Sequence, residues 1–219
     1  MPEEITKQKP EVWRRINWPG AIAGVLTIAL PFMGTWWRLT LGMDAVIMEI
    51  SPFGVDMSFF GEEAISTPLF WWLCLGLKLG VVYLGVLLLV GSILSISNRR
   101  AAIAEQFVRF SARKLLWLVV AFVVLLLIVI TLVNQLPGIF SSFIGDSFFQ
   151  LQSYLPHYLS GEGTISGGAE GVGMHLTIPV FMKLTRAFAV AVLAATLGIV
   201  SRVYQKRVSI YNYKSRRKT

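Results

Sequence analysis

Four basic side chains lie within or beside long apolar stretches of this 219-residue chain: Arg38, Lys78, Lys183 and Arg186. Basic residues at such positions bind an ion or substrate, or pair with a carboxylate. If each stretch is a helix that crosses a membrane, the depth of a residue follows from about 1.5 Å of rise per residue, counted from the cytoplasmic end. This places Arg38, Lys78 and Lys183 at the outer boundary of the membrane and Arg186 one turn deeper. We predict a basic layer there. It is either an anion site, or an anchoring layer whose side chains reach the headgroups and pair with outer acids, and we prefer the second.

Metal-ligand and catalytic residue types are sparse. His157 and His175 could bind a metal with Asp146 or Glu162, but three well-spaced ligands are not evident, so we interpret both as loop histidines. Four methionines fall near the expected outer strands, and packing explains them better than a copper site does: Met43, Met48, Met57 and Met174. Nucleophile-elbow, zinc-protease, phosphate-loop and haem-ligand patterns are missing. We expect no enzyme activity, no cofactor and no metal.

The composition is that of a membrane protein. Hydrophobic residues make up 55% of the chain, charged residues 15%, and the mean hydropathy is +0.65. Four apolar segments are long enough to cross a bilayer, which takes about 20 residues: 16–37, 67–97, 115–133 and 178–201. The sequence therefore predicts an α-helical membrane protein, a bundle of four transmembrane helices.

Basic residues are segregated between the segments that join these helices. Sixteen of the 20 Lys and Arg residues, but only four of the 12 acidic residues, lie in three of these segments: 1–15, 98–114 and 202–219. This bias predicts a multi-pass cell-membrane protein with both termini cytoplasmic and with 38–66 and 134–177 extracellular. It also explains the net charge of +8 better than nucleic-acid binding does. The basic C-terminal tail is expected to contact anionic lipids of the inner leaflet.

Small and aromatic residues suggest how the helices pack and where they meet the interfaces. Gly76 and Gly80 recur at the four-residue spacing that lets membrane helices approach closely. The last segment repeats this spacing with alanines: Ala187, Ala191 and Ala195. Tryptophans mark both ends of the first segment and predict interface anchors: Trp13, Trp18, Trp36 and Trp37.

The two outer segments are expected to form a small antiparallel sheet above the bundle. Runs 39–41, 45–50 and 55–60 are rich in strand-forming residues and are separated by turn residues, which predicts a three-stranded meander. Further on, 139–156 has the spacing of an amphipathic helix and 160–173 reads as a Gly-rich loop. A strand at 174–180 could then pair with the meander.

The passage LPFMGTWWRLTLG, Leu30 to Gly42, is similar to the Leu-Pro and Trp-Arg turn into the first strand of the claudin and peripheral-myelin-protein group. The predicted topology resembles that group over the whole chain. The first outer loop lacks the group's paired cysteines, because the single cysteine is Cys74. The resemblance implies a non-enzymatic structural, adhesion or accessory role, with other membrane subunits or further copies of the chain as partners.

Two other functions fit the sequence. A transporter or channel subunit would use Lys78, Lys183 and Arg186 to attract an anion. A subunit of a membrane enzyme complex would leave the cofactors to other chains. None of the four apolar segments carries a polar stripe along its full length, so a structural or accessory role is preferred over an anion pathway.

Overall fold

The computed structural model describes residues 16–63, 68–95, 101–144, 150–154, 159–169 and 174–216. Trp13, Asp146 and His157 lie outside these ranges. The chain forms two compact units, one made of residues 1–33, 75–119 and 189–219 and the other of residues 34–74 and 120–188. Three helices in the described part are long and apolar enough to cross a membrane: Phe70–Leu94, Ala102–Leu132 and Arg186–Gln205.

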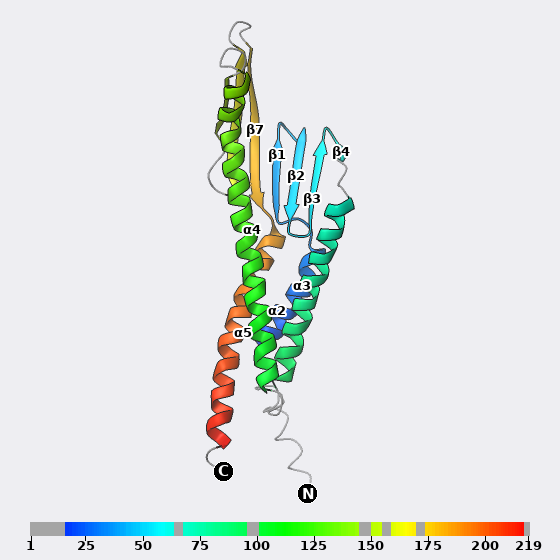
Figure 1. Cartoon of the computed structure of the whole chain (residues 1–219), viewed down its shortest axis with the longest axis vertical. Helices are drawn as coiled ribbons and strands as arrows, with labels where there is room; N and C mark the ends of the chain where they lie inside the picture. Colours follow the sequence, from blue (N-terminus) through cyan, green and yellow to red (C-terminus); the bar gives the residue numbers. More distant parts are fainter. Residues whose placement is uncertain are drawn as a thin grey trace. The chain divides into compact units, whose positions relative to one another are not determined.

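The first unit is helical. It contains α2 (Trp18–Ala29) and the 3-10 turn η1 (Leu30–Phe32), together with parts of three longer helices shown in Figure 1: α3 (Pro68–Leu94), α4 (Ala101–Ile144) and α5 (Arg186–Arg216). Its core contains Ala23, Leu88 and Val108, one from each of α2, α3 and α4, with Leu197 of α5 packed against them. Each helix thus buries one apolar stripe in a shared centre.

The first apolar segment forms a shorter helix than its length predicts. Asn17 caps α2 by accepting a hydrogen bond from the Gly20 amide, at 3.3 Å, and Pro19 occupies the first turn, where its missing N–H costs nothing. The helical part ends at Phe32, which gives about 24 Å of rise, less than the hydrocarbon thickness of about 30 Å. Pro31 and the positive φ of Gly34 account for the early end.

The prediction that the Trp36–Trp37 pair anchors the end of this helix in the interface is wrong. Trp36 follows the helix and Trp37 begins a strand, and their exposed fractions are 0% and 2%. Both rings are therefore part of a protein core. Trp18, at the other end, is about half exposed, as an interface anchor would be.

Helices α2 and α3 touch backbone to backbone at two glycines. A Cβ added to Gly24 would lie 2.8 Å from the Leu89 amide nitrogen, and one added to Gly85 would lie 2.9 Å from the Ile28 nitrogen and 3.0 Å from the Gly24 carbonyl oxygen. Real Cβ atoms do not approach backbone so closely. This pair gives the close helix contact that the sequence assigned to other glycines.

Gly76 and Gly80 make no such contact with the described residues, since an added Cβ would meet nothing within 4 Å at either. The reason is the direction in which α3 packs. Its buried stripe runs through Val81, Leu88 and Ser92, and the two glycines lie about 130° around the helix from it. The three alanines of the last segment, Ala187, Ala191 and Ala195, are all buried.

The second unit contains one seven-stranded antiparallel sheet in the order β4-β3-β2-β1-β7-β6-β5. Its strands are β1 (Trp37–Leu41), β2 (Val46–Ser51), β3 (Gly54–Phe59), β4 (Glu62–Glu63), β5 (Gln150–Tyr154), β6 (Gly161–Ala169) and β7 (Met174–Leu184). The expected meander is present as β1 to β3, visible as the blue and cyan arrows in Figure 1. The expected pairing of the last strand with the meander is present as β1 with β7.

Several predicted boundaries are wrong because helix and strand extend further than local patterns indicate. Segment 98–114, predicted as a loop, is helical from Ala101, and α4 runs unbroken to Ile144. The predicted amphipathic helix at 139–156 is divided between the end of α4 and β5, and the Gly-rich loop at 160–173 contains β6. The last predicted membrane helix, 178–201, starts as strand β7, so α5 begins only at Arg186.

We expect Gly85→Ala to lower the free energy of unfolding by about 1–3 kcal/mol, because the added methyl group overpacks a backbone contact with α2. Thermal unfolding of the full chain in mild detergent, followed by circular dichroism, measures the effect. Gly80→Ala is the matched control on the same helix and should be neutral or slightly stabilising, since alanine favours helix and meets open space. Equal effects of both substitutions would contradict the proposed contact.

Candidate functional site

The sheet has one apolar and one charged face, because successive strand residues point to opposite sides. On the apolar face, Trp37, Ile50, Val180 and Met182 are buried. Met48 and Met57 are direct cross-strand partners in the same row as Leu39, so these methionines belong to apolar strand packing. The opposite face is the candidate site.

Four charged residues form a continuous row across that face. Asp56 on β3 pairs in register with Glu49 on β2, Glu49 pairs with Arg38 on β1, and Arg38 pairs with Lys183 on β7. We call these four residues the charged row. Neighbouring strands are about 4.8 Å apart, so the row spans roughly 14 Å. From Asp56 to Lys183, the row contains two negative charges followed by two positive charges.

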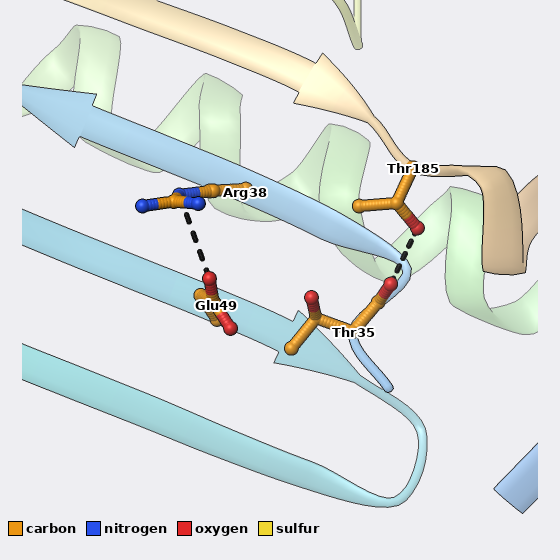
Figure 2. A network of polar contacts seen from close by, with 4 residues as sticks. All are labelled: Thr35, Arg38, Glu49 and Thr185. Carbon is orange, nitrogen blue, oxygen red and sulfur yellow. Dashed lines mark hydrogen bonds and ion pairs between the residues drawn. The ribbon is translucent and has the colours of Figure 1, made fainter. Parts of the chain in front are cut away.

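The centre of the charged row is an ion pair. Figure 2 shows the Arg38 guanidinium directed at Glu49, with Nε to Oε1 at 3.4 Å and about a third of each side chain exposed. It is the one ion pair within 4 Å in the described part of the chain. The end residues, Asp56 and Lys183, are exposed. They leave one unneutralised charge of each sign at the two ends of the row.

The charge order disfavours a purely stabilising role. Like charges directly opposite on adjacent strands destabilise a sheet, and the row contains two such pairs, Asp56 with Glu49 and Arg38 with Lys183. Alternating signs would give three attractive pairs from the same four residues. The arrangement instead makes a dipolar surface, which is suited to binding a complementary one.

A pocket of about 560 Å³ opens beside the positive half of the row. Arg38 and Lys183 line one part of it, while Asp44 and Glu162 supply carboxylates from the β1–β2 turn and from β6. Phe181 is a half-exposed aromatic ring in the same lining. With two cations and two carboxylates, the pocket is close to neutral overall. It fits a group of mixed charge better than a simple anion.

Hydrogen bonds fix the strands that carry these residues. The Trp37 indole Nε1 donates to the Leu159 carbonyl oxygen at 2.8 Å, which holds the segment before β6 against β1. The Thr185 amide donates to the Trp36 carbonyl oxygen at 3.0 Å, and the Thr185 hydroxyl donates to the Thr35 carbonyl oxygen, as drawn in Figure 2. These contacts close the end of the β1–β7 pairing where Trp37 faces Leu184. At the other end, the Gly42 amide donates to the Pro179 carbonyl oxygen at 2.9 Å.

An aromatic cluster lies at the start of β1. The Trp36 ring meets Phe53, Phe122 and Phe188 edge to face, with centroids 5.7, 5.1 and 6.0 Å away. These rings come from the β2–β3 turn, α4 and α5. Edge-to-face pairs of this kind each add about 0.5–1.5 kcal/mol beyond burial. The cluster thus holds β1, and with it Arg38, in a fixed position.

Two of the four residues of the predicted basic layer lie side by side in the second unit. Arg38 and Lys183 are cross-strand partners on β1 and β7, whereas the prediction placed Arg38 just after the first membrane helix and Lys183 within the last one. Arg186 is exposed and is the first residue of α5. Lys78 is exposed on α3 in the first unit, about 50° from the centre of that helix's buried stripe, with no described carboxylate within 4 Å.

Sequence reasoning missed a buried polar cluster in the first unit. The Asn17 Nδ2 donates to the Ser201 Oγ at 2.9 Å and to the Gln205 Oε1 at 3.2 Å, and the Ser95 hydroxyl donates to the same Gln205 oxygen at 2.7 Å. All four side chains are buried. They connect the start of α2 to α3 and α5. A sequence feature that could have revealed this cluster is the occurrence of isolated polar residues at the ends of apolar runs.

Beside the polar cluster there is no room for a side chain at Gly20 of α2. A Cβ added to Gly20 would lie 2.2 Å from the Ser92 Oγ and 2.3 Å from the Ser201 Oγ. Among the residues whose placement is described, no group of three His, Cys, Asp or Glu could hold a metal ion. The hydroxyls and amides of the cluster bond to one another and to backbone groups of the helices, which identifies it as a structural connection between helices.

We expect the Arg38–Glu49 pair to contribute a coupling free energy below about 1 kcal/mol, because both side chains are a third exposed. A double-mutant cycle of Arg38→Gln, Glu49→Gln and the double variant, measured by detergent-phase unfolding, gives this value, which should fall further in high salt. A coupling of about 3 kcal/mol or more would mean that the charged row exists for stability.

Comparisons with known proteins identify no relative: no protein-family model, no curated protein and no solved structure matches this chain. The charged face and the apolar helices are therefore the features from which a function is inferred.

Proposed function

We propose that this chain is a non-enzymatic integral membrane protein of the claudin-like type, which associates through the charged face of its sheet. In this proposal the sheet is extracellular, both termini are cytoplasmic, and α2 is a fourth, short span beside the three longer ones. The role is structural: adhesion, lateral assembly or service as an accessory subunit. The observation that carries the proposal is the charged row, in which like charges are adjacent at two of the three positions and both end residues are exposed.

The order of charges in the row supports a second copy of the chain as the partner. A twofold axis parallel to the strands would turn one row over onto another, so that Asp56 meets Lys183 and Glu49 meets Arg38 of the facing copy. Every charge then meets its opposite, which is the self-complementarity that a twofold interface requires. The half-exposed Phe181 ring lies on the same face and would supply apolar contact.

An anion pathway is the second candidate, since Arg38 and Lys183 share a pocket with the hydroxyls of Thr40 and Ser160. The carboxylates of Asp44 and Glu162 in the same lining weigh against it, because they offset the positive potential that would attract an anion. The pocket is better suited to a mixed-charge protein surface. Association through the sheet is therefore the preferred function.

A charge exchange at the ends of the row tests the partner. Lys183→Glu and Asp56→Lys should each lower self-association of the full chain about tenfold, because each brings like charges together twice in the twofold pair. An equimolar mixture of the two variants should restore association, since opposite charges meet again at both ends. Both substituted residues are exposed, so folding should be retained.

Association is measured by fluorescence energy transfer between labelled copies in lipid nanodiscs or vesicles, and vesicle clustering reports the adhesion variant. Arg202→Glu, an exposed change of similar charge outside the sheet, should leave association unchanged. If neither single variant weakens association, or if the mixture fails to restore it, the charged row does not bind a second copy.

The four-span topology has a separate test. Short epitope tags at the two termini should be protected or exposed together in sealed vesicles, because an even number of spans returns the chain to its starting side. Protease digestion before and after permeabilisation measures this. Opposite accessibility of the two tags would leave three spans and place α2, about 24 Å long, at the membrane surface.

A further inference from the structure

The first half of α4 carries a basic and aromatic face that the proposed association does not use. Arg109, Arg113 and Lys114 share it with Phe110 and Trp117, and together with Gln106 they line a pocket of about 660 Å³. The Lys114 ammonium lies 5.9 Å from the centre of the Phe110 ring. We call these six residues the α4 basic face.

This face points away from the core of its unit. By the helical period, its centre lies about 180° around α4 from the buried stripe formed by Ala104, Val108, Ser111, Leu115 and Val119. The three cations are exposed and have no carboxylate within 4 Å in the described part of the chain. Unpaired positive charges on an exposed face of a membrane helix are stabilised by binding an anionic group.

The position along α4 identifies the boundary of the membrane. No charged residue occurs from Leu115 to Val133, so the cations end where the apolar run begins. Trp117 lies at the start of that run and is more than half exposed, the usual place for an interfacial tryptophan. The cations therefore stand at headgroup depth.

The same face continues into the apolar part as an exposed stripe. Val120, Val124 and Ile128 follow Trp117 at helical spacing, and each is about half exposed. A ligand that binds the cations thus has an apolar track beyond its anionic group. A free phosphate ion would use only the first part of this surface.

We propose that the α4 basic face binds the phosphodiester headgroup of an anionic phospholipid, whose acyl chain lies along the apolar stripe. The guanidinium groups of Arg109 and Arg113 hold phosphate oxygens through paired N–H donors, and Lys114 adds a third positive charge. Trp117 packs at the level of the glycerol. This site needs the membrane location alone and does not depend on the association of the sheet.

Lipid retention by the purified full chain tests the proposal. The double variant Arg109→Gln/Arg113→Gln should bind phosphatidylglycerol about tenfold more weakly or worse, as measured by native mass spectrometry and by lipid exchange in mixed micelles. Binding of phosphatidylcholine should not change. The control, Arg202→Gln, removes positive charge from an exposed position on α5 and should retain phosphatidylglycerol.

Two results would overturn the assignment. Equal loss in the control would mean that overall charge, not the α4 basic face, attracts the lipid. Displacement of phosphatidylglycerol by millimolar inorganic phosphate would mean that the site takes a free anion and makes no use of the apolar stripe. Because the readout is bound lipid, failure here is distinct from failure of the charge exchange on the sheet.

Discussion

The pairing of β1 with β7 is the interaction on which the second unit depends. It joins two segments about 140 residues apart in the chain, and it merges a four-stranded and a three-stranded piece into one sheet. Without it there would be four exposed strand edges in place of two, each a row of unpaired backbone groups. The contacts of Thr185 and Trp37 around this pairing, and the aromatic cluster at Trp36, reinforce the same join.

The β1–β7 pairing also creates the candidate site. Arg38 pairs with Lys183 only because β1 and β7 are in register, and Glu49 and Asp56 extend the row through β2 and β3. The join therefore converts separate charges into a dipolar surface with a defined order. Stability gains little from this order, since like charges are adjacent at two of the three positions. A surface of this kind is suited to meeting its own copy turned about a twofold axis.

The helices of the first unit are held together by other interactions, because the association of apolar helices in lipid gains no hydrophobic free energy. The close backbone contact at Gly24 and Gly85 provides van der Waals attraction between α2 and α3. The cluster around Asn17 and Gln205 provides hydrogen bonds between helices. These contacts use the inward faces of the helices. The opposite face of α4 is exposed and carries three cations, and in the proposed lipid site these cations select an anionic headgroup.

The sequence by itself determined the class of protein and many of its elements. Apolar runs of the right length predicted the helices, and strand-forming runs between turn residues predicted β1, β2 and β3, because hydrophobicity and turn chemistry are local properties. The sequence also suggested that the strand at 174–180 could pair with the meander, and the structure shows this pairing between β7 and β1.

Only the tertiary structure decided which residues meet. Lys183 follows an apolar run, IPVFM, that fits a helix or a strand equally well, and pairing with β1 makes it a strand. Glycine spacing on α3 likewise indicated a contact at Gly76 and Gly80, but the buried stripe of this helix makes Gly85 the glycine that touches α2. Register and packing direction depend on segments far away in the chain, so no local pattern could supply them.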